Sequence, residues 1–223
     1  MRWVGGHRRL MPSVGAGRIG GMAAEEIEDI VGEDFSDARL SGQQWSDRRY
    51  TGCTFRDADL SELRTERVVF TDCDFTGADL TGSHHTVAAF RSCTFARTTL
   101  WHSEFHSSTM LGSTFEQCRL RPIQFDEVDF TLASLGKADL RGVDFTDCRL
   151  REANLVESDL RDTALRAVDL FGARTFGLRL EGADLRGAHV DASLWTTAKL
   201  DGAKIDLTQA VAMAAAHGLV VEH

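Results

Sequence analysis

The sequence predicts an all-β solenoid whose chain coils through four short sides per turn, and two periods along its 223 residues are the observations that predict it. From Phe35 to Ile205, every residue at a multiple of five is large and apolar, except Thr65, His85 and Thr175. A period of five fits neither an α-helix nor a flat strand. The backbone must therefore return to the same orientation every five residues, as in a coil with regular corners.

A second period, of twenty residues, sets the number of sides. Every twentieth residue from Leu40 to Leu200 is a leucine, and the column that starts at Phe35 is phenylalanine as far as Phe115. Four groups of five residues therefore form one turn. Each side is too short to bury a core alone, so about nine turns, spaced by ~4.8 Å, must stabilise one another by stacking. Pro122 has no backbone N–H, so we expect it at a corner or beside an interrupted ladder.

The two ends of the chain depart from the period. The first residues carry several arginines and glycines, without the continuous apolar run of a signal peptide. The expected segments are a disordered N-terminal extension at 1–21, an N-terminal cap or lead-in at 22–34, the repeat region at 35–205, and a C-terminal helix and dimerisation tail at 206–223.

The C-terminal segment has the signals of a helix. The stretch from Asp206 to Gln209 has the pattern of a capping box, in which two side chains satisfy the first free N–H groups. An alanine-rich run follows, and Gly218 suits the position just beyond a helix end. We therefore expect a helix over 207–216.

The composition points to a reducing compartment and away from the membrane. All five cysteines precede an interior position by two residues, which assigns them to packing between turns. A disulfide framework or a zinc site would need cysteines clustered at ligand spacing. No apolar run is long enough to cross a membrane. We therefore expect a cytoplasmic protein that does not bind membranes.

The sequence contains no motif for catalysis. Glycines recur at corner positions, so none forms a phosphate-binding loop, and no serine or cysteine sits in a nucleophile elbow. His84, His102, Glu104 and His106 could approach one another on neighbouring turns, but their spacing matches no recognised zinc motif. His85 occupies an interior position, where we expect a hydrogen-bonded core residue. The sequence thus predicts a protein that is not an enzyme and holds no cofactor or metal ion.

Acidic side chains gather in columns, which favours a basic partner. The chain holds 34 acidic and 25 basic residues, a net charge of −9. Aspartates on neighbouring turns repel one another by about 1 kcal/mol per close pair in water. An aspartate just before an interior position can also hydrogen-bond the turn backbone, so a structural role stays open for each one. The candidate acidic face consists of Asp37, Asp57, Asp59, Asp79, Asp139 and Asp159.

Two features limit this acidic face. Arg39, Arg119 and Arg179 interrupt the column that holds Asp59. Duplex DNA as long as nine stacked turns, roughly 43 Å, would carry about 25 negative charges. The total charge of the chain is therefore too small to make a DNA mimic by itself.

The repeat resembles that of the pentapeptide-repeat family, whose motif is A(D/N)LXX. The stretches Ala58–Leu60, Ala78–Leu80 and Ala183–Leu185 match this motif as written. The resemblance covers residues 35–205, and it implies a right-handed quadrilateral β-helix.

Segments outside the repeat formula resemble the fluoroquinolone-resistance members of this family from mycobacteria. These segments are Leu63–Arg67, Arg97–Ser103, Cys118–Pro122 and Gln209–Gly218. The resemblance implies a homodimer that imitates duplex DNA, binds and inhibits DNA gyrase, and protects it from fluoroquinolones, without binding nucleic acid itself. It does not say which gyrase subunit is bound.

The C-terminal end is where the resemblance implies the two-fold contact of the dimer. Apolar residues there exceed what a cap over the last turn needs, and exposed apolar patches mark contacts. The alternative is that the helix only covers the open end of the coil. The residues expected in the dimer interface are Phe171, Phe176, Leu207, Val211, Ala212 and Ala215.

A scaffold for a partner other than gyrase is the alternative function. Trp101, Leu111 and Leu132 would form its exposed apolar patch. Charge alone does not choose between the two functions, but the segments outside the repeat formula favour gyrase.

Overall fold

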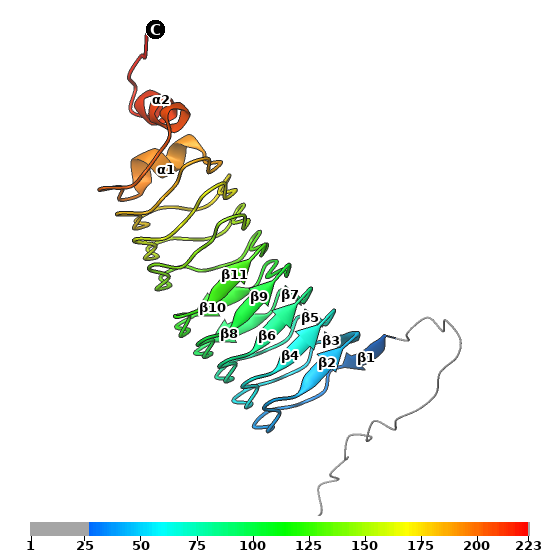
Figure 1. Ribbon diagram of the computed structural model, residues 1–223. Helices are drawn as coiled ribbons and strands as arrows, with labels where there is room; N and C mark the ends of the chain where they lie inside the picture. The colour runs from blue at the N-terminus through cyan, green and yellow to red at the C-terminus, as the bar shows by residue number, and fades with distance from the viewer. Residues whose placement is uncertain (1–26, 223) are drawn as a thin grey trace, which may run out of the picture.

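The computed structural model describes residues 27–222 and shows a β-solenoid, a rod of stacked turns with two helices at its C-terminal end (Figure 1). The extension expected at 1–21 lies outside the described residues. Strands of successive turns are parallel, and their partners are twenty residues apart, as in Ile30↔Tyr50 and Tyr50↔Phe70. The predicted fold class, a right-handed quadrilateral β-helix with a short C-terminal helix, is confirmed.

Each turn has four sides, which we name by the residues at their centres. Side A contains Phe55, side B Leu60, side C Thr65 and side D Phe70, each with the residues stacked on it at twenty-residue intervals. Side C carries the sheet β2-β4-β6-β9-β11, side D the sheet β1-β3-β5-β7, and side A the pair β8-β10. The strands are β1 (Glu28–Val31), β2 (Gln44–Ser46), β3 (Arg48–Thr51), β4 (Arg64–Glu66), β5 (Val69–Thr71), β6 (His84–Thr86), β7 (Ala89–Arg91), β8 (Thr94–Ala96), β9 (Glu104–His106), β10 (Thr114–Glu116) and β11 (Gln124–Asp126).

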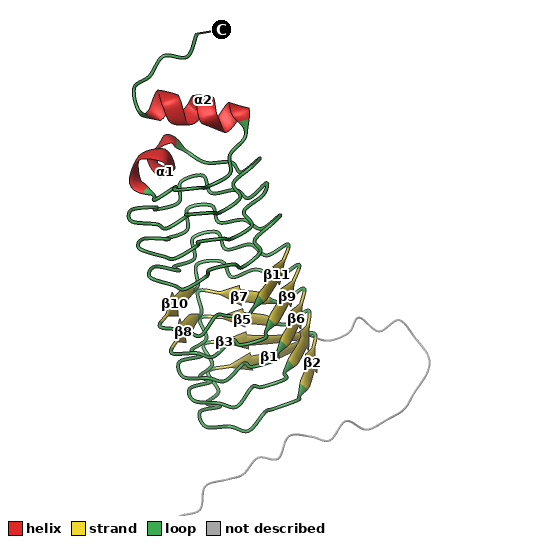
Figure 2. Ribbon diagram, turned by 60° about the vertical axis from the view of Figure 1, so that its left-hand side comes forward, coloured by secondary structure: helices red, strands yellow, loops and turns green. Residues whose placement is uncertain are grey.

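The same register extends beyond the strands at both ends. After β11 the ladder continues as single bridges, the last of them Asp184↔Lys204, so Figure 2 shows the later turns as loops. At the other end, β1 falls within the segment expected as a lead-in and already pairs in register with β3.

One residue at most corners adopts a left-handed backbone conformation. It lies two positions after the interior residue, as at Gly77 (φ 73°) and Asp57 (φ 53°). Glycine adopts this conformation without strain, and aspartate tolerates it better than most residues. A Cβ at position 77 would lie 2.0 Å from Oδ1 of Asp57, one turn earlier. At this corner an aspartate carboxylate therefore lies directly against a glycine.

The interior is filled by columns of stacked side chains. Phe55, Phe75 and Phe95 stack with ring centroids 5.0 Å apart and planes 5° from parallel. On side B, Leu60 and Leu80 are buried in the same core. The interior positions read from the sequence are thus the core of the rod.

The polar exception His85 is fully buried and hydrogen-bonded on both ring nitrogens. Its Nδ1 lies 2.8 Å from Oγ1 of Thr65, itself a polar exception, and its Nε2 lies 3.0 Å from Oγ of Ser83. Burial lowers the pKa of His85 to about 3, so the ring is neutral at physiological pH. The expected hydrogen-bonded core histidine is confirmed.

The ladder is interrupted where Pro122 occupies a corner. Corner residues elsewhere donate their N–H to the next turn, as Glu62 does to the carbonyl of Thr81 (2.8 Å). Pro122 has no N–H to donate. On sides B and C, the described residues of this turn show no such bond from Leu120 or Phe125 to the turn that follows. The expectation for Pro122 is confirmed.

Sides A and D stay paired across the same interruption. Side A keeps the bridge Thr114↔Ser134, and side D keeps Asp129↔Arg149. Cys118 is only half-buried there, unlike the fully buried cysteines of earlier turns. We call this opening on sides B and C, between residues 117–127 and 136–146, the seam.

Two helices close the C-terminal end of the rod (Figure 2). The first, α1 (Ala192–Thr197), replaces one side of the repeat and begins where the carboxylate of Asp191 accepts the N–H of Ser193. The second, α2 (Leu207–Ala216), has the predicted capping box between Asp206 and Gln209. The amide of Gln209 also donates to the carbonyl groups of Leu185 and Ala188, which fixes α2 to the last turns.

Candidate interaction faces

Four of the predicted acids lie together early in the rod, on side B and at its corner with side A. Asp59 and Asp79 are bridge partners on side B, and Asp37 and Asp57 are left-handed corner residues. None of the four takes part in a salt bridge within residues 27–222. We call these four residues the acidic corner.

The side-B aspartates of the acidic corner also shape the turn. Oδ1 of Asp59 accepts hydrogen bonds from the N–H (3.1 Å) and the hydroxyl (2.6 Å) of Ser61. Oδ1 of Asp79 accepts the N–H of Thr81 (2.9 Å). The other carboxylate oxygen makes no hydrogen bond in the described chain, so the structural role leaves the negative charge available.

The two later acids of the predicted face are paired with arginines of the same chain. Asp139 contacts Arg121 (2.8 Å) and is held by two hydrogen bonds from Arg141 (2.9 and 2.8 Å). Asp159 is held in the same way by Arg161 (2.8 and 2.7 Å). The hydrogen bonds from Arg141 and from Arg161 lower the pKa of the two carboxyl groups, respectively.

The sequence contains a signal that separates these two kinds of aspartate. Where the motif reads Asp-Leu-Arg, the arginine folds back on the aspartate, as also happens between Asp184 and Arg186 (2.7 Å). Where it reads Asp-Leu-Ser or Asp-Leu-Thr, the aspartate bonds only the turn. The sequence analysis did not use this difference and grouped all six acids together.

Side B is basic beyond the acidic corner. Five arginines project from its later turns, and two of them, Arg141 and Arg179, also reach Asp159 at 3.9 and 3.5 Å. We call this set the arginine ladder: Arg119, Arg121, Arg141, Arg161 and Arg179. Asp139 and Asp159 therefore lie within a basic surface and are separate from the acidic corner.

The predicted dimer residues lie at the C-terminal end, and most are exposed. Phe176 is 69% exposed and Leu207 is 83% exposed, and Val211 lies one helical turn after Leu207. Ala212 and Ala215 are exposed on α2. The sequence analysis missed Leu219, Val220 and Val221, an exposed apolar run that follows α2.

Phe171 has partners of its own within the chain. The guanidinium of Arg151 lies 4.9 Å from its ring centroid, and the ring of His189 stacks on it at 5.3 Å. Its exposed surface is therefore smaller than that of Phe176. The side chain of Phe171 can still lie at the rim of the expected dimer interface.

The exposed residues of the alternative scaffold do not form one patch. Trp101 projects from side B, whereas Leu111 and Leu132 lie at the edge of side D, on the opposite side of the coil. A flat apolar partner could contact only one of these groups at a time.

The histidines considered for zinc are only partly brought together. Nε2 of His84 and Nε2 of His106 lie 3.5 and 3.6 Å from the same oxygen of Glu104 on side C. His102 lies elsewhere, beside the ring of Trp101. Within residues 27–222 no group of three such side chains is arranged to hold a metal ion.

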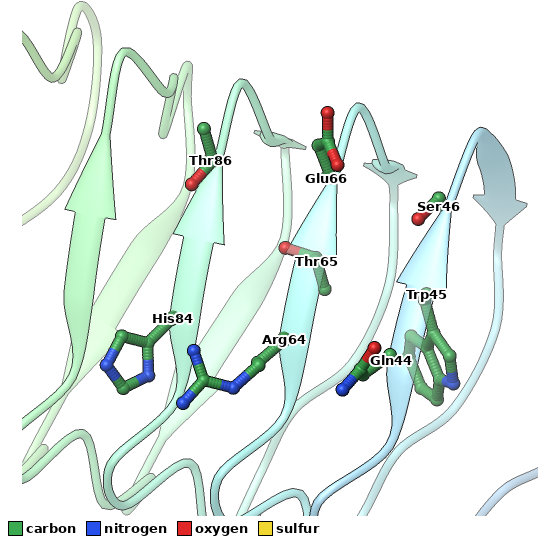
Figure 3. Close-up of a pocket in the computed structure, with 8 residues that line it drawn as sticks. All are labelled: Gln44, Trp45, Ser46, Arg64, Thr65, Glu66, His84 and Thr86. Atoms are coloured by element: carbon green, nitrogen blue, oxygen red, sulfur yellow. The ribbon is translucent and has the colours of Figure 1, made fainter.

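Side C also has an open hollow of about 400 Å³ (Figure 3). Arg64 and His84 extend from β4 and β6 along one edge of it, and Glu66 and Thr86 lie along the other. The lining is mixed in charge and follows the regular columns of the sheet.

No helix among the described residues has the length and apolarity needed to span a membrane.

Comparison with known proteins agrees with the repeat. A family model described as "Pentapeptide repeats (8 copies)" matches residues 51–84, and one described as "Pentapeptide repeat region" matches residues 98–175. The chain is 62% identical over 101 residues to the pentapeptide repeat protein MfpA of Mycobacterium tuberculosis. That match covers 45% of this chain and 55% of MfpA, about half of its length.

Solved structures show the same fold. The full-length structure of QnrB1, a plasmid-mediated fluoroquinolone resistance protein, matches with a TM-score of 0.66 and 18% identity, over 86% of this chain and 97% of QnrB1. A trypsin-treated form of QnrB1 matches with a TM-score of 0.64 and 20% identity, over 87% of this chain and 98% of that chain. At these identities the likeness concerns the fold alone. The five-residue period, the four-sided coil and the matched repeats together establish that the chain belongs to the pentapeptide-repeat family.

Proposed function

We propose that this protein binds DNA gyrase in place of duplex DNA, and so inhibits the enzyme and shields it from fluoroquinolones. The observation that carries the proposal is the acidic corner, four carboxylates that form no salt bridge within residues 27–222. The segments that resemble fluoroquinolone-resistance proteins support gyrase as the partner, as does the 62% identity to MfpA over 101 residues.

The local density of charge fits this role better than the total charge does. The four acids span two steps between turns, about 10 Å at β spacing. Duplex DNA of that length carries roughly six charges. Arg39, the bridge partner of Asp59, offsets one of the four charges, so the acidic corner has about half the charge of DNA of that length, a larger share than that of the whole rod. A basic groove that normally holds phosphates would meet a similar local potential.

The proposed active form is a cytoplasmic homodimer joined at its C-terminal end. The exposed side chains of Phe176, Leu207 and Val211 support this contact, because a monomer rarely leaves such a group in water. Two rods joined at this end would hold one acidic corner near each outer end of the assembly.

The experiment compares the wild type with a double charge reversal, Asp59→Lys with Asp79→Lys. Purified wild-type protein should reduce DNA supercoiling by gyrase, and added salt should weaken the association, because electrostatic attraction between exposed charges is screened. The double variant should bind gyrase at least tenfold more weakly, on the scale of about 1 kcal/mol for each reversed charge.

The matched control is Asp201→Lys, which reverses an exposed acid on side B far from the acidic corner. It should leave gyrase binding within twofold of the wild type, at the level of a change outside the contact. Gyrase binding without salt dependence and without loss in the double variant would refute the surrogate mechanism.

A further inference from the structure

Side B places two patches of opposite charge along one line of the rod. The column of Asp59 and Asp79 continues through Thr99 to Arg119 by consecutive bridges. Asp79 and Arg119 are therefore two turns apart, about 10 Å. The acidic corner and the arginine ladder face the same direction, and a partner that lies along side B meets both.

The arginine ladder has more positive charge than its own aspartates compensate. Arg121, Arg141, Arg161 and Arg179 share Asp139, Asp159 and Glu181, and Arg119 pairs with none of them, so the ladder has two more positive charges than these three acids compensate. Arg119 is exposed and makes no salt bridge within the described residues. A ladder that served only the stability of the turns would not need this excess.

The guanidinium groups also keep donors for an outside ligand. Each guanidinium has five N–H groups, and Arg161 uses two of them on Asp159. The side chains of Arg121, Arg141 and Arg179 are 35%, 45% and 36% exposed. Because the aspartates already hold these arginines in place, binding an outside carboxylate would cost less side-chain entropy.

We propose that side B is a two-part docking surface for a single protein partner, whose basic patch meets the acidic corner and whose acidic patch meets the arginine ladder. The inference rests on the proposed function, since it describes the gyrase surface that this side would contact. The two patches on the partner lie roughly 20 Å apart, from centre to centre, at the spacing of the turns. A nucleic acid does not fit, because its uniform negative charge would be repelled by the acidic corner within one screening length.

The test is whether reversing the charge of one arginine weakens or strengthens gyrase binding. In Arg119→Glu, the partner's acidic patch meets a new negative charge, so gyrase should bind about fivefold more weakly. Arg91→Glu is the matched control, because Arg91 is also exposed and without a salt bridge but lies on side D. It should change binding by less than twofold, and both variants should unfold at the wild-type urea concentration.

The possible results separate this inference from the proposed function. One possible result is that gyrase binds the wild type, binds the Asp59→Lys, Asp79→Lys variant weakly, and binds Arg119→Glu more tightly than the wild type. The partner surface is then basic throughout, and the two-part surface is refuted. Unchanged binding of Arg119→Glu refutes it as well, because the arginine ladder then has no partner. If gyrase does not bind the wild type at all, the proposed function fails, and the inference fails with it.

Discussion

At the scale of single residues, the residue two positions after each side-B aspartate decides what that carboxylate can do. Serine or threonine at this position, as at Ser61 and Thr81, bonds the aspartate and leaves its charge in place. Arginine, as at Arg141, neutralises it with two hydrogen bonds. One substitution can thus move a turn from an acidic surface to a neutral one without changing the fold.

Gly77→Ala should reduce gyrase binding by more than its effect on stability explains. A Cβ at position 77 meets Oδ1 of Asp57 at 2.0 Å, so the carboxylate must turn away from the acidic corner. The left-handed backbone (φ 73°) adds about 1 kcal/mol of strain. Urea unfolding and gyrase binding measure the two effects separately.

Gly142→Ala is the control for this substitution. Gly142 has a similar backbone (φ 69°) and open space where a Cβ would lie. It should lose a similar amount of stability, about 1 kcal/mol, and keep wild-type binding. Equal binding by both variants would show that the position of the Asp57 carboxylate does not matter.

The buried histidine should make the stability of the rod depend on pH. The pKa of His85 is about 3 in the folded protein and 6.5 in an exposed histidine. The unfolded chain therefore binds more protons below pH 6.5, and stability, fully present above that pH, falls as the pH is lowered from 6.5 towards 3. The slope approaches about 1.4 kcal/mol per pH unit.

His85→Phe removes this titration and keeps an aromatic ring stacked near Phe105, which lies 4.6 Å from the imidazole in the wild type. Urea unfolding of both proteins at pH 7.5 and pH 5 gives the comparison. The wild type should lose about 2 kcal/mol more than the variant between these values. Equal losses would mean that the imidazole takes up a proton without leaving its site.

The sequence predicted the interior far better than the surface charges. The positions of Phe55 and His85 follow from the five-residue period, because the period is the fold itself. The pairing of Asp139 with Arg121 depends on the distance between neighbouring turns and on side-chain direction, which the period does not specify. The neighbouring arginine of the Asp-Leu-Arg motif was visible in the sequence, but its contact with the carboxylate was not.

At the scale of elements, the C-terminal helices determine how the rod ends. The capping box of α2 was readable from local residues, because Asp206 and Gln209 are only three positions apart. The short helix α1 was not predicted. Leu194 takes the outward position before Trp195 that is polar in most turns, and both side chains are buried in α1.

Replacing Val211 and Ala215 with arginine should abolish the proposed dimer. Both side chains lie on the exposed surface of α2, so the monomer should fold normally, but the charges would be buried in an apolar contact. Sedimentation at micromolar concentration should show a dimer for the wild type and a monomer for the double variant. Gln44→Arg, an exposed change on β2 at the other end of the rod, is the control and should remain dimeric. A wild type that sediments as a monomer would end this part of the proposal.

At the scale of the whole molecule, the seam divides a rod that is otherwise continuous. The backbone N–H of Leu160 is bonded to Arg179 at 2.8 Å, as the ladder requires, whereas that of Leu120 has no such bond across the seam. We expect the Leu120 amide to exchange with deuterium at least a hundredfold faster than the Leu160 amide, because an amide without a backbone hydrogen bond needs only a small local opening to exchange. Exchange measured by NMR at neutral pH tests this, and equal protection of the two amides would show that the seam is closed in solution.

The position of the seam relative to the charges gives the rod a property that a uniform coil lacks. At this turn the backbone ladder is intact on sides A and D but missing on sides B and C, where the side-chain pair Arg121–Asp139 crosses the seam, so the least costly bend of the rod is a rotation about sides A and D. Such a rotation widens or narrows side B between the acidic corner and Arg141. The acidic corner lies before the seam and three of the five arginines of the ladder, Arg141, Arg161 and Arg179, lie after it. The protein in this respect resembles a caliper, whose opening can adjust to the separation of the matching patches on the partner surface.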